Sequence, residues 1–445
     1  PNTTILNFKK FILKIIFIIY NSIMKNNLRD ISLLIHNKNF SEAIESLKNL
    51  DQSEKNNPNY YFLKGVSYLY LGNYNSAIEG FSQSLKLNSN NPTFYFYRGF
   101  AFSKLNEFEK TEEDYLKAIS LKPNAPEFYN NLAGIYYTTG ENGKAIENYI
   151  KAIELNKDLK PSISGLLNVL SQTKNINIKN SKIVLAHNNL NKINIKYSSE
   201  NQIEDFEIKD LFKEINLILE NNLNGLEFDK VQTYREQKLP PHCKRHKKIF
   251  NTLNFIPKHC FECYKIQIEV DSVLELMKLY VVFDNIKLDK DNSRKCMIEL
   301  RPEVSGNYKG LIFCNSIAET EIVLNQVKKI LYNNFNKELN CKIKRGCSEY
   351  YPKFPSYNKL DKTAMLYDEK NKEREKIFDE KNPDLIFNKN SNPTIKGLSL
   401  FDALVFRNWL TFARLIGDNS YKEISDKIFQ SKFVENQLKI KLSKN

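Results

Sequence analysis

Two closely spaced residue pairs with metal-ligand chemistry lie near the middle of the chain. Cys243 and His246 form the first pair, and Cys260 and Cys263 form the second, each with two residues between its members. Thiolates and imidazoles are ligands that zinc prefers, and a two-residue gap lets both members of a pair reach one tetrahedral ion. The spacing therefore predicts a zinc site.

These side chains also suit different chemistry. His242 and His259 could replace His246 as ligands, and an iron–sulfur cluster could use the thiolates, although the ordered cysteine spacing of a ferredoxin is missing. A basic setting could instead activate Cys243 as a nucleophile. Cysteine is also among the most buried residue types, so the thiols could simply pack as small apolar side chains.

The elements that follow predict a small α+β domain. Strands are predicted at residues 264–270, 295–301, 308–314 and 341–347, from β-branched and aromatic residues and turn signals. Helices are predicted at residues 272–286 and 316–333, each opened by a capping box. The order β-α-β-β-α-β is that of a split βαβ, ferredoxin-like sheet.

This topology brings cysteines together. Right-handed crossovers make the first two strands parallel and the last two opposite to them, so the starts of one pair meet the ends of the other. Five cysteines are expected at that edge of the sheet: Cys260, Cys263, Cys296, Cys314 and Cys347. Cys341 is expected at the far end of its strand, and Cys243 could fold back onto the edge.

A repeat of 34 residues precedes this domain. Small residues recur at Gly65, Gly99 and Ala133, and aromatic residues recur in the same register three positions later. Small residues let two helices approach, and aromatic residues fill the space between neighbouring helix pairs. The pattern resembles the tetratricopeptide repeat (TPR) family over residues 24–157. The resemblance implies an α-solenoid of helix pairs, which a helix over residues 161–170 would close.

The resemblance also implies a groove for a protein or peptide partner, lined by the first helix of each pair. The matching positions are Phe62, Val66, Tyr70, Phe96, Phe100, Asn130 and Tyr137. They depart from the basic groove that clamps a peptide's C-terminal carboxylate. They suit an apolar or extended peptide, or the second half of the same chain. The alternative is that some of them are inter-repeat core.

Composition divides the rest of the chain. Residues 1–23, a basic start and a short apolar run before Met24, are expected to be an extension or a gene-model artefact. The expected divisions are 24–170 (solenoid with its closing helix), 171–233 (linker with a helix over 203–223), 234–348 (Cys/His-rich domain), 349–397 (polar excursion) and 398–433 (C-terminal helices). The apolar segment 400–416 contains three charged residues, so we expect a buried helix and no membrane span.

The formal charge of +14 lies mostly in the second half of the chain. Such a charge suits nucleic acid, but Lys, Asn and Ile are abundant throughout, as biased codon composition produces. We predict a cytoplasmic, non-catalytic interaction protein whose solenoid binds a partner and whose second domain is metal-stabilised. One alternative is an enzyme with the Cys/His edge as its active site, acting on a protein presented by the repeats. A second is an RNA-binding protein.

Overall fold

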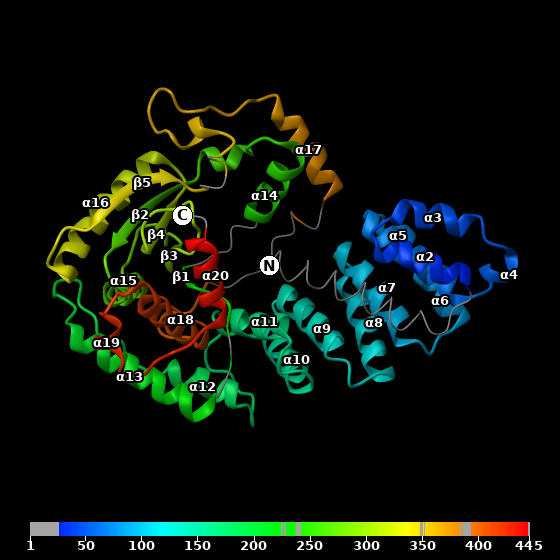
Figure 1. Ribbon diagram of the computed structural model, residues 1–445, viewed down its shortest axis with the longest axis horizontal. Helices are drawn as coiled ribbons and strands as arrows, with labels where there is room; N and C mark the ends of the chain where they lie inside the picture. The colour runs from blue at the N-terminus through cyan, green and yellow to red at the C-terminus, as the bar shows by residue number, and fades with distance from the viewer. Residues whose placement is uncertain are drawn as a thin grey trace. The chain divides into compact units, whose positions relative to one another are not determined.

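The computed structural model describes residues 26–223, 226, 228–236, 242–347, 350, 352–382, 385 and 393–443. The predictions for residues 1–23 lie outside them. The chain divides into two compact units, residues 1–166 and 167–445. Each unit has its own architecture (Figure 1).

Unit 1 consists of successive helix pairs. Its helices are α2 (Asn26–His36), α3 (Phe40–Lys48), α4 (Gln52–Lys55), α5 (Pro58–Leu71), α6 (Tyr74–Leu87), α7 (Pro92–Lys104), α8 (Phe108–Leu121), α9 (Pro126–Thr139), α10 (Asn142–Leu155) and α11 (Lys160–Leu170), which continues into unit 2. Helices α5, α7 and α9 each begin with proline, where a helix needs no N–H donor. Gly72 and Gly140 end α5 and α9 with φ of +84° and +88°.

Glycines set the close approach of the paired helices. A Cβ on Gly80 of α6 would lie 2.9 Å from the backbone of Gly65 in α5. A Cβ on Gly99 of α7 would lie 3.0 Å from the ring of Tyr115 in α8. The small residues of the repeat therefore lie where one helix backbone contacts the backbone or an aromatic ring of the paired helix, as the periodicity predicts.

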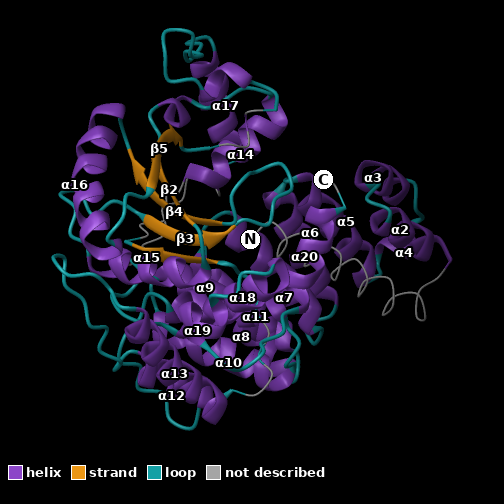
Figure 2. Cartoon of the chain, turned by 60° about the vertical axis from the view of Figure 1, so that its left-hand side comes forward, coloured by secondary structure: helices purple, strands orange, loops and turns teal. Residues whose placement is uncertain are grey.

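Unit 2 is built on a five-stranded antiparallel sheet with the strand order β1-β3-β4-β2-β5 (Figure 2). The strands are β1 (Gln232–Arg235), β2 (Tyr264–Val270), β3 (Arg294–Ile298), β4 (Tyr308–Cys314) and β5 (Asn340–Arg345). Strands β2 and β4 have the predicted bounds. Strand β1 was not predicted, because four residues are too few to show a pattern.

Helices and short 3-10 turns complete unit 2. They are α12 (Lys182–Leu190), α13 (Asp205–Asn222), α14 (His242–Leu253), η1 (Lys258–Phe261), α15 (Val273–Asn285), α16 (Ile317–Phe335), η3 (Pro355–Asn358), α17 (Asn371–Lys381), α18 (Leu400–Ile416), α19 (Tyr421–Ile424) and α20 (Lys432–Leu442). Helix α15 packs closely on the sheet, since a Cβ on Gly310 of β4 would lie 2.5 Å from Leu279. Helix α18 is buried as expected, and its Trp409 donates to the carbonyl of Val231 over 2.9 Å.

Two segments are more ordered than their composition indicates. The expected linker holds α12 as well as the predicted helix α13, and it buries Val184 and Phe212. The expected polar excursion holds η3 and α17, and it buries Tyr357 and Phe378. A few apolar anchors among many charged residues are enough to order such a segment. Among the helices that the structure describes, none combines the length and apolar character needed to cross a bilayer.

Candidate functional site

The predicted groove residues of unit 1 divide into buried and accessible side chains. Phe62, Val66 and Phe96 are at most 5% exposed. Phe62 packs on the rings of Phe81, Phe94 and Tyr97, and Phe96 stacks on Tyr115 and Phe128. These three positions belong to the core between helices, so a ligand cannot reach them without displacing that core.

The other four groove positions are partly exposed. Tyr70 stacks on Phe40 with their ring centroids 4.9 Å apart, and Asn130 accepts a hydrogen bond from Ser162 over 2.8 Å. Phe100 lies 4.8 Å below the ammonium of Lys104, and Tyr137 is half-buried. The partly exposed positions of the predicted groove are therefore aromatic or amide side chains, and Phe100 and Tyr137 are the aromatic ones on α7 and α9.

Three thiols meet at one end of the sheet in unit 2. Cys260 lies in η1, Cys263 directly precedes β2, and Cys347 follows β5. The Cys260 and Cys347 thiols are hydrogen-bonded to each other, and the backbone N–H of Gly346 donates to the carbonyl of Cys263 over 2.8 Å. The structure describes all seven cysteines and joins none of them in a disulfide. Three of the five cysteines expected at this edge are thus close neighbours.

Cys243 and the imidazoles lie around these thiols. Cys243 is exposed on the first turn of α14 and is an electrostatic neighbour of Cys263. The rings of His246 and His259 have centroids 5.4 Å apart. The side chain of His242 lies outside the described residues. Within the described ranges, no three His, Cys, Asp or Glu side chains are arranged so that they could hold a metal ion as they stand.

The remaining cysteines occupy separate places. Cys314 ends β4 opposite Tyr264, one residue from Cys263, as the topology predicts. Cys341 pairs with Ile268 toward the far end of β5, also as predicted. Cys296 does not join the edge, because β3 places it opposite Gly310, in the middle of β4. It is buried and lies near Arg235.

The chemistry of the thiols follows from their burial. The hydrogen bond that the Cys260 thiol shares with Cys347, and then burial, raise the pKa of Cys260. Burial, and then Cys347 and Cys243, raise the pKa of Cys263 to about 12. A nucleophilic cysteine needs a lowered pKa, so Cys260 and Cys263 are poor nucleophiles in this arrangement. The geometry suits structural thiols better than catalytic ones.

The thiols lie at the base of a small lobe that the sequence did not predict. Helix α14 contacts α17 through Arg245 and Asp379, and η1 contacts Tyr350 and Tyr357 through Cys260. Figures 1 and 2 both place α14 beside α17. One small apolar cluster contains Ile256, Cys260, Tyr350 and Tyr357, and another contains Ile249, Phe255 and Phe378. The two tyrosines, seven residues apart in a charged segment, were the signal that could have revealed this packing.

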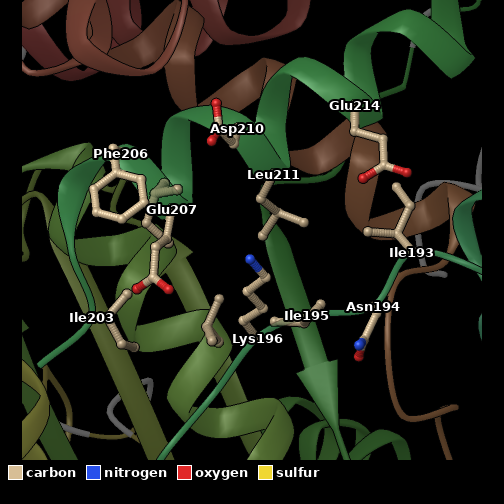
Figure 3. Close-up of a pocket in the computed structure, with 12 residues that line it drawn as sticks. Ile193, Asn194, Ile195, Lys196, Ile203, Phe206, Glu207, Asp210, Leu211 and Glu214 are labelled. Atoms are coloured by element: carbon tan, nitrogen blue, oxygen red, sulfur yellow. The ribbon is translucent and has the colours of Figure 1, made fainter. Parts of the chain in front are cut away.

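A shallow pocket of about 230 Å³ lies beside the first half of α13 (Figure 3). Its apolar lining includes Ile193, Ile203 and Leu211, and its polar lining includes the carboxylates Glu207, Asp210 and Glu214 with one ammonium, Lys196. The sequence did not single out these residues. The pocket could receive an apolar side chain that carries a basic neighbour.

Comparison with protein families assigns unit 1. A TPR repeat model matches residues 65–106, and a tetratricopeptide repeat model matches residues 92–125 and 126–159. The predicted TPR repeats are therefore confirmed for residues 65–159. These repeats are a protein-interaction scaffold.

Similar solved structures are TPR proteins. MamA 41-end from Desulfovibrio magneticus RS-1 is 21% identical with a TM-score of 0.31, and the match covers 33% of this chain and 85% of that one. A thermophilic TPR protein in Thermus thermophilus is 22% identical with a TM-score of 0.30, covering 32% and 80%. The first TPR of Spaghetti (RPAP3), bound to the HSP90 peptide SRMEEVD, is 20% identical with a TM-score of 0.25, covering 25% and 89%. The search of curated proteins found no match.

Proposed function

We propose that the repeats bind an extended, uncharged segment of a partner protein, with Phe100 and Tyr137 as the main contact residues. The observation that carries the proposal is the TPR array itself, matched at residues 65–159 and built of helix pairs. Phe100 and Tyr137 are the two accessible aromatic side chains on α7 and α9 among the predicted groove positions. Aromatic side chains supply large contact areas with few rotatable bonds.

The polar surroundings of these residues support the choice of ligand. Asn130 has an amide side chain that already holds Ser162, and Lys104 is placed over Phe100. No cluster of basic side chains occupies the seven groove positions, so a terminal carboxylate has no matching cradle there. An internal peptide segment with apolar side chains fits these positions better than a terminal carboxylate does.

A peptide-library selection on the full chain tests this function. We expect selected peptides to share apolar or aromatic side chains, to lack a required C-terminal carboxylate, and to protect the amides of α7 and α9 from hydrogen exchange. Selected peptides that protect only the amides of α6 and α8, or only the amides of unit 2, would contradict the proposed groove.

We also propose that the core of unit 2 is a ferredoxin-like split βαβ module. The run β2-α15-β3-β4-α16-β5 has the required element order, and the spatial order β3-β4-β2-β5 with antiparallel neighbours supports it. Strand β1 adds a fifth strand beside β3. The enzyme and RNA-binding alternatives, and the cytoplasmic location, stay predictions.

A further inference from the structure

The pocket beside α13 has a buried apolar floor. Ile203, Ile208 and Val281 are at most 4% exposed, and they come from the loop before α13, from α13 itself and from α15. Figure 3 shows a second wall, residues 193–196, facing α13. Pockets that hold whole small molecules usually measure about 300–1,000 Å³. At about 230 Å³ this pocket is smaller, so it fits an inserted side chain better.

Apolar surface continues from the pocket along the outside of α13. Phe206 lines the pocket although it is 64% exposed, and Leu217, eleven residues later, is 59% exposed. Eleven residues make about three helical turns, so the two side chains lie on the same side of the helix. Large apolar side chains gathered at a pocket mark a binding surface, whereas scattered ones do not.

The carboxylates of α13 indicate which charge the pocket favours. Three of the five acidic side chains of this helix have partners within unit 2, in the contacts Asp205–Lys278, Glu207–Glu204 and Glu220–Lys427. The other two are Asp210 and Glu214, and both line the pocket. Within the described part of the chain, neither of these two carboxylates forms an ion pair or a hydrogen bond.

Helix stability does not explain the pair Asp210 and Glu214. The helix dipole stabilises acidic side chains only in the first turn, and both residues lie beyond it. Since they are four residues apart, they share one face of the helix, where like charges repel. The pocket lining carries three carboxylates against one ammonium, in a chain whose formal charge is +14. This surface therefore attracts basic groups that the rest of the chain repels.

We propose that the pocket is a docking surface of unit 2 for a partner-protein segment that inserts a leucine or isoleucine side chain and carries lysine or arginine one helical turn away. The inserted side chain covers Ile203 and Val281, and Phe206 contacts it from the rim. The cation lies between Asp210 and Glu214 and relieves their repulsion. The apolar contact supplies affinity, and the carboxylates select basic segments against acidic ones.

Fluorescence anisotropy of a labelled amphipathic peptide built of Leu, Lys and Ala, titrated with the full chain, tests the proposal. We expect saturable binding with a Kd below about 1 mM. The same peptide with Glu in place of Lys should not bind, and Ser in place of Leu should weaken binding about fivefold or more. Bound Leu/Lys peptide should protect the amides of residues 193–196 and of the first half of α13 from hydrogen exchange.

Variants of the full chain assign the binding to the pocket. Asp210→Asn/Glu214→Gln removes both counter-charges and should weaken binding of the Leu/Lys peptide about fivefold or more. Glu321→Gln/Glu338→Gln is the matched control, because it removes two exposed carboxylates of unit 2 outside the pocket, and it should bind as wild type does. All four side chains are exposed, so we expect the two double variants and wild type to unfold at the same urea concentration.

Absence of saturable binding by wild type, or equal affinity of wild type and Asp210→Asn/Glu214→Gln, overturns the proposal. Spermine that binds as tightly as the Leu/Lys peptide overturns it too, because the pocket would then recognise only a cation. Sedimentation velocity examines the remaining occupant, a second copy of the chain. A dimer that Phe206→Ala dissociates would assign this surface to self-association and contradict the proposed partner.

Discussion

Arg245 of α14 binds Asp379 of α17 through two parallel hydrogen bonds, Nε–Oδ1 at 2.6 Å and Nη2–Oδ2 at 2.9 Å. Glu375, one turn earlier, accepts from the same guanidinium over 2.8 Å. Residues 134 apart in sequence are thereby joined by a charge-assisted fork. The polar segment after the sheet is held by this fork and a few aromatic side chains.

Loss of the fork should loosen the lobe selectively. Arg245→Ala removes the cation between two carboxylates, and we expect about 2 kcal/mol less protection of the α17 amides in hydrogen exchange. Lys376→Ala, on the exposed side of the same helix, should leave these amides unchanged. Equal protection of α17 in wild type and Arg245→Ala would show that the fork does not order the segment.

A second buried cation joins three elements of unit 2. Arg235 of β1 is bonded to Asp284 of α15 and to Asp402 of α18, and all three side chains are at most 6% exposed. Removing one partner of a buried ion network leaves the remaining charges uncompensated. We expect Arg235→Leu to lower the free energy of unfolding of unit 2 by about 3–5 kcal/mol in urea titration.

The control for this variant is an exposed arginine. Arg301 is 44% exposed, and its buried partner Glu299 keeps a second cation, Lys309 at 3.2 Å, so Arg301→Leu should cost clearly less than Arg235→Leu. Similar losses for the two arginine variants would show that burial does not determine the energy of these pairs.

Acid should destabilise unit 2 through His187. This side chain is fully buried, its Nδ1 accepts the N–H of Leu400 at the start of α18, and burial lowers its pKa to about 4. Between pH 6.5 and pH 4 the unfolded chain takes up a proton that the folded chain refuses, so stability falls as pH falls through this window. The loss should approach about 3 kcal/mol near pH 4.

Comparison with His187→Gln isolates this contribution. Glutamine does not titrate, so the variant should lose less stability than wild type when urea titrations at about pH 7 and about pH 4.5 are compared. If wild type and His187→Gln lose the same free energy of unfolding between these pH values, His187 is not the responsible group.

Helix approach in unit 1 should depend on Gly80. A methyl group there would lie 2.9 Å from the Gly65 backbone and 3.0 Å from the Tyr61 carbonyl, and neither backbone can move cheaply. We expect Gly80→Ala to cost about 1–3 kcal/mol in thermal unfolding, although alanine is the better helix former. Gly143→Ala in α10 meets nothing within 4 Å and should gain up to about 1 kcal/mol. If Gly80→Ala and Gly143→Ala change the thermal stability in the same direction, this account of the helix packing is contradicted.

Periodicity made unit 1 predictable, because small and aromatic residues recur over several repeats and each repeat supports the next. In unit 2, the β-branched and aromatic residues of β2 and β4, with the turn signal before β4, were enough to give their bounds. Register was not predictable: Cys296 stands opposite Gly310 and not at the sheet edge, since a strand's pairing partner depends on tertiary contacts. The partner of Arg245 was equally hidden, because nothing local links it to Asp379.

The groove positions show a second limit of sequence patterns. Phe62, Phe96 and Phe100 are all phenylalanines on first helices of a repeat, yet only Phe100 is accessible. Repeat position alone does not tell a core aromatic from a contact aromatic, because that depends on how neighbouring pairs stack.

The affinity of the full chain for a library-selected peptide, measured by calorimetry in wild type and Phe100→Glu/Tyr137→Glu, tests the central claim most directly. Two charges in an aromatic groove should weaken binding of an apolar segment by about 2 kcal/mol or more, which is over tenfold in Kd. The control Leu87→Glu/Leu116→Glu places two charges on exposed positions of α6 and α8 and should bind as wild type does. Equal affinity of wild type and the Phe100/Tyr137 variant would contradict the proposed partner-binding groove.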